Sequence, residues 1–407
     1  MSPARIFRNS FSGLCAIVIA AAVFTACGKQ DEKTELGKAE TTSKKQADDA
    51  PAVDSAEELS LGKAAFEQND YENAVKHLEL AAKQSNSEAR KLLKNAELFW
   101  KAEKGNAEAL YKVGQLYCRG DGVEQSEAEA VKWYLKSAEL GYAEAQYDLG
   151  MRYNMGWGIP KDDVESAKWY LKAAEQGDVA AQSVIGNFYE KGIGVEKNEA
   201  EAVKWHRKAA EKGDSGSQTA LGRCYEKGIG VEKDEAEAVE WYRKAADQGY
   251  AEAQCRLGVC YYEGIGVKED EDEAVKWLRN PADLGIAEAQ YYFGKCCLYG
   301  FGVEKDLSEA VNWYRKAAER GNAKAPYELG KCYEKGIGVD PDEKEAVKWY
   351  REGVYLEDVD SMYELGKCYE KGFGVKQNEK EAVKWYRKAA DLGSVSASDA
   401  LLRFSED

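Results

Sequence analysis

The chain has 407 residues, with 57 lysines and arginines against 73 aspartates and glutamates, and a formal net charge of -16. This acidic balance argues against a nucleic-acid partner, because phosphate binding requires a basic surface. Protein partners are therefore favoured, and 25 Tyr, 10 Trp and 10 Phe supply ample bulk for a core.

Residues 1–26 have the pattern of a secretory signal peptide, with Arg5 and Arg8 before an apolar run that is short for a membrane span. The run ends in Phe24-Thr25-Ala26-Cys27, which resembles the lipobox of bacterial lipoproteins. The resemblance implies that Cys27 carries lipid, and a chance cysteine after an ordinary signal peptide is the alternative. Lipoproteins retained in the inner membrane commonly have aspartate where this chain has Gly28. We therefore expect secretion across the inner membrane and an outer-membrane anchor on the periplasmic face.

Residues 27–54 contain the proposed lipidated cysteine and then mostly charged and small residues. Such a segment cannot offset its ordering entropy by burying apolar surface. We expect a disordered tether with a reach on the order of 30 Å.

Residues 55–105 are predicted to be helical. Gly62, Ala74 and Ala81 are spaced like the anchor positions of a tetratricopeptide unit. We interpret the segment as one such unit followed by a shortened, degenerate helical connector.

Glycine and tryptophan then recur every 36 residues, the difference between Gly114 and Gly150. The glycines are Gly114, Gly150, Gly186, Gly222, Gly258, Gly294, Gly330 and Gly366, and the tryptophans are Trp133, Trp169, Trp205, Trp241, Trp277, Trp313, Trp349 and Trp385. No insertion or deletion interrupts the series. Eight units are therefore predicted over residues 106–393, followed by a C-terminal cap and tail over 394–407.

Apolar residues within each unit recur at helical spacing, which predicts two amphipathic helices. The first helix ends at a G-x-G-V loop such as Gly228-Ile229-Gly230-Val231, where glycine permits a left-handed cap. The second helix opens with a capping box such as Asp234 with Glu237, and a glycine usually ends it.

The run Ala251-Glu252-Ala253-Gln254-Cys255-Arg256-Leu257-Gly258 and the run Glu237-Ala238-Val239-Glu240-Trp241-Tyr242-Arg243-Lys244-Ala245-Ala246 resemble the Sel1-like repeats, relatives of the tetratricopeptide repeats. The resemblance implies an all-α fold, a right-handed α/α superhelical solenoid of helix pairs. It also implies a scaffold or adaptor that binds a protein or peptide on its concave face.

Catalytic and cofactor signals are weak. The two histidines, His77 and His206, lie at positions best explained by structure, and His206 stands where most repeats have tyrosine. The G-x-G-V loops follow helices and recur in every unit, which favours turns over nucleotide binding. We expect no enzyme activity, no cofactor and no metal.

Eight cysteines follow Cys27, and five of them share the register two residues after the repeat glycine. Equivalent positions on stacked helices lie about 8–10 Å apart, beyond the reach of a disulfide. In cysteine-rich members of the family, bridges join the two helices of a repeat, but no second helix here contains cysteine. Buried free thiols are therefore favoured, with an unusual pairing of Cys255 or Cys297 left open.

The tetratricopeptide register places groove residues six and three positions before the repeat glycine and one, four and five after it. Two stripes on the predicted first helices follow from this register. They are the tyrosines Tyr111, Tyr147, Tyr291, Tyr327 and Tyr363 and the lysines Lys295, Lys331 and Lys367.

Departures from the repeat add a second set of candidates, because shared residues are already explained by packing. The second unit has Met151, Met155 and Trp157 in place of polar residues, and the fifth and sixth have Tyr262, Tyr292, Leu298 and Tyr299. Exposed side chains of these types are enriched at binding hot spots. We hypothesise that the Tyr262–Tyr299 region is a recognition surface, with local repacking as the alternative.

Two irregularities predict a changed superhelical pitch over residues 280–360. Pro281 lies inside a second helix, and the seventh unit has Glu357 in place of its terminal glycine. An envelope-anchored, monomeric scaffold is the favoured function. An immunity or inhibitor lipoprotein that sequesters a toxic enzyme is the alternative, because an acidic surface would suit a basic toxin.

Overall fold

A computed structural model describes residues 54–404, and within this range the chain forms 20 helices and no strand. The predicted signal peptide, Cys27 and nearly all of the predicted tether lie outside the described residues. The helices are α2 (Ser55–Glu67), α3 (Tyr71–Lys83), α4 (Ser87–Glu103), α5 (Ala107–Arg119), α6 (Glu127–Glu139), α7 (Ala143–Met155), α8 (Asp163–Glu175), α9 (Val179–Lys191), α10 (Glu199–Glu211), α11 (Ser215–Lys227), α12 (Glu235–Asp247), α13 (Ala251–Glu263), α14 (Glu271–Asp283), α15 (Ala287–Tyr299), α16 (Leu307–Glu319), α17 (Ala325–Lys335), α18 (Glu343–Tyr355), α19 (Val359–Lys371), α20 (Glu379–Asp391) and α21 (Val395–Leu402).

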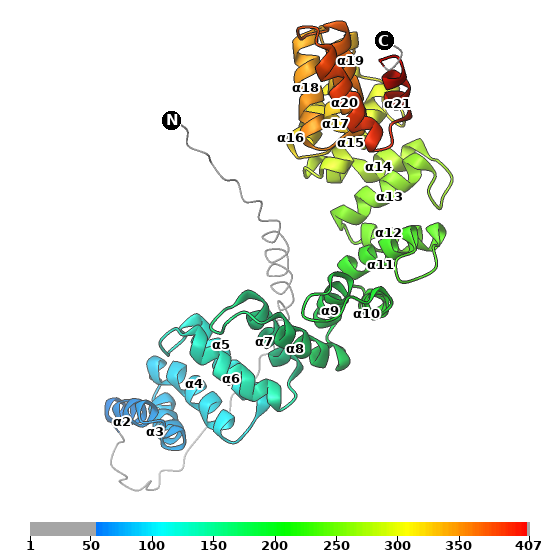
Figure 1. The fold of residues 1–407 in the computed structure, drawn as a ribbon. Helices are drawn as coiled ribbons and strands as arrows, with labels where there is room; N and C mark the ends of the chain where they lie inside the picture. The colour runs from blue at the N-terminus through cyan, green and yellow to red at the C-terminus, as the bar shows by residue number, and fades with distance from the viewer. Residues whose placement is uncertain (1–53, 405–407) are drawn as a thin grey trace, which may run out of the picture. The chain divides into compact units, whose positions relative to one another are not determined.

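Each helix packs against the next one along the chain, and Figure 1 shows this succession from α2 to α21. Helices α5 to α20 form the eight repeats, each with a first and a second helix. Before them, α2 and α3 form a leading pair, and the segment interpreted as a degenerate connector contains the single 17-residue helix α4. The predicted all-helical architecture of stacked pairs is confirmed. None of the described helices combines the length and apolarity needed to cross a membrane.

The two glycines of the G-x-G-V loop have different structural roles. Gly228 ends α11 with φ 68°, the left-handed conformation that was predicted. Gly230 also has a positive φ of 67°, and a Cβ there would overlap the carbonyl oxygen of Glu199 in the preceding repeat. The second glycine therefore allows neighbouring repeats to approach backbone to backbone.

Each second helix begins at a polar N-cap, as predicted, but only half of the predicted capping box forms. The side chain of Asp234 accepts a hydrogen bond from the Glu237 N–H at 3.0 Å. The Asp234 N–H, however, donates to the Tyr225 carbonyl at 2.9 Å, near the end of the first helix. Because that donor is already satisfied, Glu237 instead accepts a bond from the Trp241 indole at 2.9 Å.

Close packing within a repeat depends on the glycine in the middle of the first helix. A Cβ on Gly222 would lie 2.6 Å from the ring of Tyr242, which is buried on the second helix. The Tyr242 hydroxyl donates to Glu226 at 2.5 Å. The corresponding bonds join Tyr350 to Glu334 and Tyr386 to Glu370.

The irregular units differ locally from their neighbours. Helix α14 continues through Pro281 as one element, and α17, with Pro326 in its first turn, has 11 residues rather than 13. Glu357 has φ 63°, so it takes the left-handed conformation that glycine adopts in the other repeats. The change of pitch expected over residues 280–360 stays a prediction.

Candidate functional site

The first helices present most of the residues that the sequence selected for binding. Exposure differs widely among them. Tyr299 is 53% exposed, whereas Tyr262, Leu298, Tyr327, Tyr363, Lys295 and Lys331 are partly buried. Several of these side chains pack against one another and form a cluster.

Tyr291 and Tyr292 do not fit the expectation of exposed binding residues. They are only 6% and 7% exposed. Their rings contact each other at a centroid distance of 5.2 Å, and the Tyr292 hydroxyl donates to Glu263 at 2.5 Å. These two rings belong mainly to the packing between repeats, because the stacked helices cover them.

Lys295 lies against three tyrosine rings, and we call this group the lysine–tyrosine cluster. Its Nζ is 4.9 Å from the ring centroid of Tyr262, 5.6 Å from that of Tyr292 and 5.7 Å from that of Tyr291. Tyr262 in turn contacts Tyr292 at 5.3 Å and Phe301 at 6.0 Å. Residues from α13, α15 and the following loop therefore meet here, and the recognition role of the Tyr262–Tyr299 region stays a prediction.

Glu328 on α17 lies beside this cluster. Burial raises the pKa of its carboxyl group, and the charge of Lys295 acts in the opposite direction. Within residues 54–404 its carboxylate has neither an ion pair within 4 Å nor a hydrogen bond. It is therefore a partly buried acid without a direct partner.

A second consequence of the sixth repeat's sequence concerns Tyr314. Leu298 occupies the position at which Glu226, Glu334 and Glu370 accept a tyrosine hydroxyl. The Tyr314 hydroxyl is consequently buried without a hydrogen-bond partner among the described residues. The sixth repeat thus lacks the internal polar pair seen in the fourth, seventh and eighth repeats.

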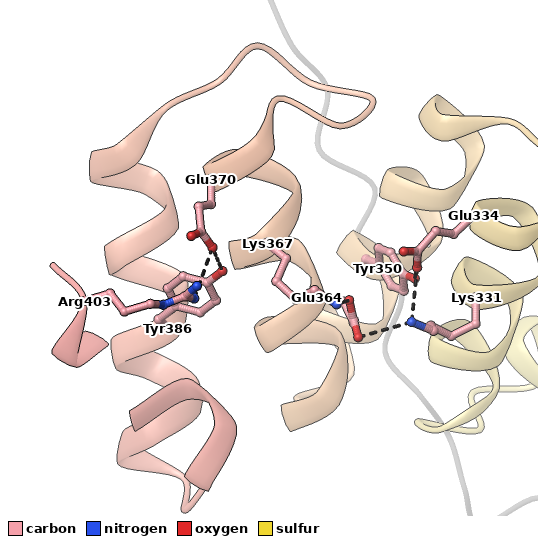
Figure 2. A network of polar contacts seen from close by, with 8 residues as sticks. All are labelled: Lys331, Glu334, Tyr350, Glu364, Lys367, Glu370, Tyr386 and Arg403. Carbon is pink, nitrogen blue, oxygen red and sulfur yellow. Dashed lines mark hydrogen bonds and ion pairs between the residues drawn. The ribbon is translucent and has the colours of Figure 1, made fainter. Parts of the chain in front are cut away.

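The seventh and eighth repeats contain two groups of polar contacts, which Figure 2 shows. Lys331 contacts Glu334 at 3.2 Å and Glu364 at 3.3 Å, and Lys367 also binds Glu364, at 2.6 Å. These residues and Tyr350 form the first group, and the second consists of Glu370, Tyr386 and Arg403, in which Arg403 reaches Glu370 at 3.5 Å. Here the charges satisfy one another across repeats.

The other predicted patch, in the second repeat, does not form one surface. Met155 and Trp157 are 47% and 48% exposed. Met151, by contrast, packs against the core cluster that contains Tyr170 and Phe188. The first two stay candidates for contact with a partner, and Met151 is better explained by packing.

Sequence reasoning missed the charged residues two positions before the repeat glycine. They include Asp148, Arg256, Glu328 and Glu364, and all of these but Glu328 contact a neighbouring repeat. Tyr111 donates to Asp148 at 3.0 Å, and Arg256 contacts Glu288 at 3.2 Å. The signal in the sequence was a charge at this position in five of the eight repeats, where the other three have Val184, Ala220 and Tyr292.

The repeat geometry described above agrees with the family comparison. The model of the Sel1 repeat matches residues 58–86, 107–142, 143–178, 179–214, 215–250, 251–285, 287–322, 323–357 and 359–394. The chain belongs to the Sel1-repeat family. The match at 58–86 falls on the leading pair, which the sequence alone suggested to be an ordinary tetratricopeptide unit.

Two solved structures support this Sel1-repeat assignment. A protective antigen of uropathogenic Escherichia coli is 36% identical with a TM-score of 0.62, and the match covers 74% of this chain. This chain spans 65% of that protein, which is less than two thirds of its length. A Sel1 repeat protein from Oxalobacter formigenes is 29% identical with a TM-score of 0.58, covering 76% of this chain and 89% of the other. A search of curated proteins gave no match.

The histidines and cysteines of this Sel1-repeat protein are mostly buried or in contact with other side chains. Burial lowers the pKa of His206 to about 4, and neither ring nitrogen has a hydrogen-bond partner among the described residues. His77 contacts Glu58 at 2.7 Å.

The eight described cysteines are free, and all but Cys118 are buried, as predicted for small apolar fillers. Burial raises the pKa of the Cys332 thiol to about 12, which keeps it protonated and unreactive.

Proposed function

We propose that the protein is a non-enzymatic scaffold that binds a protein or peptide through the first helices of its Sel1 repeats. The observation that carries the proposal is the lysine–tyrosine cluster with the unpaired Glu328 beside it. Other charged groups of the seventh and eighth repeats, namely Lys331, Glu334, Glu364 and Lys367, pair with one another. An exposed tyrosine and an unpaired carboxylate on one face are available for contact with a partner, because packing within the protein does not occupy them.

Site-specific photo-crosslinking in the native cell tests this proposal. A photoreactive phenylalanine analogue at Tyr299, on the first helix α15, should give an adduct with a protein partner. The matched control is Tyr355, which is 80% exposed on the second helix α18. Equal adducts from both positions, or none from Tyr299, would contradict binding by the first helices.

We further propose that Cys27 carries lipid and anchors the protein at the periplasmic face of the outer membrane. The support is the sequence Phe24-Thr25-Ala26-Cys27 after an apolar run. Changing Cys27→Ala should move the protein from the membrane fraction to the soluble fraction. Retention in the membrane fraction would contradict lipid anchoring.

The excess of acidic residues also supports the narrower alternative, an immunity or inhibitor protein that sequesters a basic toxic enzyme. The crosslinked partner distinguishes the two roles. An enzyme whose activity is lost in the complex indicates immunity, and a partner that stays active indicates a scaffold.

A further inference from the structure

An ion pair that links the seventh and eighth repeats does not form at the equivalent positions of the sixth and seventh repeats. Lys331 contacts Glu364 at 3.3 Å, and the same two repeat positions hold Lys295 and Glu328. Lys295 instead lies over the tyrosine rings, 4.9 Å from that of Tyr262. The cation is therefore stabilised by aromatic faces, and the carboxylate is left without a direct partner.

The surroundings of Glu328 make a new cation favourable there. The negative charges of Asp358 and Asp360 act on Glu328, and the positive charge of Lys331 acts against them. Lys331, however, already forms ion pairs with Glu334 and Glu364. Burying a carboxylate without a partner is costly, because the protein does not replace the lost hydration. A positively charged group that reaches Glu328 would remove this cost.

Aromatic side chains beside the carboxylate suit a long basic side chain. Tyr299 is 53% exposed and contacts Phe301 at a centroid distance of 5.5 Å. Burial raises the pKa of Tyr291, and the negative charge of Glu328 raises it further. Guanidinium and ammonium groups pair with carboxylates and also stack on aromatic rings.

We propose that Glu328 receives an arginine or lysine side chain from a basic peptide segment of the partner, which packs beside Tyr299. This inference rests on the proposed scaffold function and names the partner's chemistry. The net charge of -16 would also attract such a segment over a distance and speed its capture.

Selection from a displayed library of random peptides tests the inference on the full chain. The selected peptides should be enriched in arginine and lysine. The consensus peptide then serves as the probe, and its affinity is measured by fluorescence anisotropy. Glu328→Gln should weaken binding at least tenfold, whereas Glu304→Gln, an exposed acid in the loop of the sixth repeat, should leave it unchanged.

Charge reversal provides the second arm. A selection against Glu328→Lys should no longer favour basic residues, and thermal unfolding of each variant verifies that it is folded. Peptides that bind equally well to Glu328→Gln would overturn the role of Glu328 and leave the scaffold function standing. Equal losses in Glu328→Gln and Glu304→Gln would show general charge attraction and would also overturn it. A selection that yields no binding peptide contradicts the proposed peptide-binding function itself.

Discussion

Glu357 holds a backbone conformation that seven other repeats give to glycine. Its φ is 63°, and the equivalent Gly321 has φ 85°. A side chain costs about 1–2 kcal/mol in this region, because Cβ crowds the following carbonyl. The loss of the glycine was visible in the sequence, but the retained left-handed turn was not, because the neighbouring helices impose it.

Glu357→Gly should therefore raise the free energy of unfolding by about 1 kcal/mol, measured by guanidinium unfolding. Gly321→Ala is the matched control, since it introduces a side chain at the same position with no atom within 4 Å. It should lower stability by a similar amount. An unchanged midpoint for Glu357→Gly would show that residue 357 is not strained.

His206 makes stability depend on pH. Burial lowers its pKa to about 4 from 6.5, and Glu190, Arg223 and Asp214 are the charged groups near it. Because the folded state holds the proton less tightly than the unfolded chain, stability is lost as pH falls from 6.5 towards 4.

The expected loss that His206 causes between pH 7 and pH 5 is about 2 kcal/mol. His206→Tyr restores the usual repeat residue, whose hydroxyl can donate to Glu190. Between pH 7 and pH 5, the free energy of unfolding of this variant should therefore fall by about 2 kcal/mol less than that of the unchanged protein. Urea unfolding at the two pH values measures the difference. Parallel pH dependence of the two proteins would exclude His206 as the cause.

At the scale of the element, each G-x-G-V loop is both the end of a helix and a contact between repeats. The sequence predicted the first role from the position of the glycines after the helix. The second role depends on a distance to the preceding repeat, which no local pattern contains. Asp234 gave a similar partial result: its cap was predicted, but its N–H pairs with Tyr225 rather than with the glutamate side chain.

Gly230→Ala should cost about 3 kcal/mol, from the positive φ together with overlap with the Glu199 carbonyl. Gly249→Ala provides the comparison, because it has φ 83° and no atom within 4 Å. It should cost about 1 kcal/mol. Thermal unfolding of the two variants measures the difference, and equal losses would mean that the loop contact between repeats is unimportant.

At the scale of the whole array, neighbouring repeats are joined by a recurring glutamine. Gln218 donates to the Ala210 carbonyl at 3.1 Å, and Gln146, Gln182, Gln254 and Gln290 make the same bond. The seventh and eighth repeats have Pro326 and Met362 at this position. They therefore lack a bond that joins the earlier repeats.

Hydrogen exchange should reveal this difference, because local opening follows the weakest contacts between repeats. Amides in the middle of α17 should exchange at least tenfold faster than those of α11, measured by mass spectrometry. Met362→Gln should slow exchange in α19, and the exchange of α11 serves as the internal reference. Uniform exchange across the array would show that these glutamines do not set the coupling.

The period of 36 residues made the helices, their ends and the stacking predictable, because each unit repeats the same evidence. The binding surface was less accessible to such reasoning. Tyr292 departs from the repeat yet is buried, whereas Glu328 drew no attention because its importance lies in a missing partner. A sequence pattern indicates which residues are present. Only the fold shows which of their charged and polar groups have a partner.

The contact of Gly230 with the preceding repeat has a consequence for how such a chain can change in evolution. Six other loop glycines make the same close approach, namely Gly158, Gly194, Gly266, Gly302, Gly338 and Gly374. A single inserted residue would move a glycine away from its carbonyl, whereas loss or duplication of one complete unit rejoins matching ends. Unequal recombination between repeats can therefore alter the length of the array in whole steps while every junction keeps its geometry.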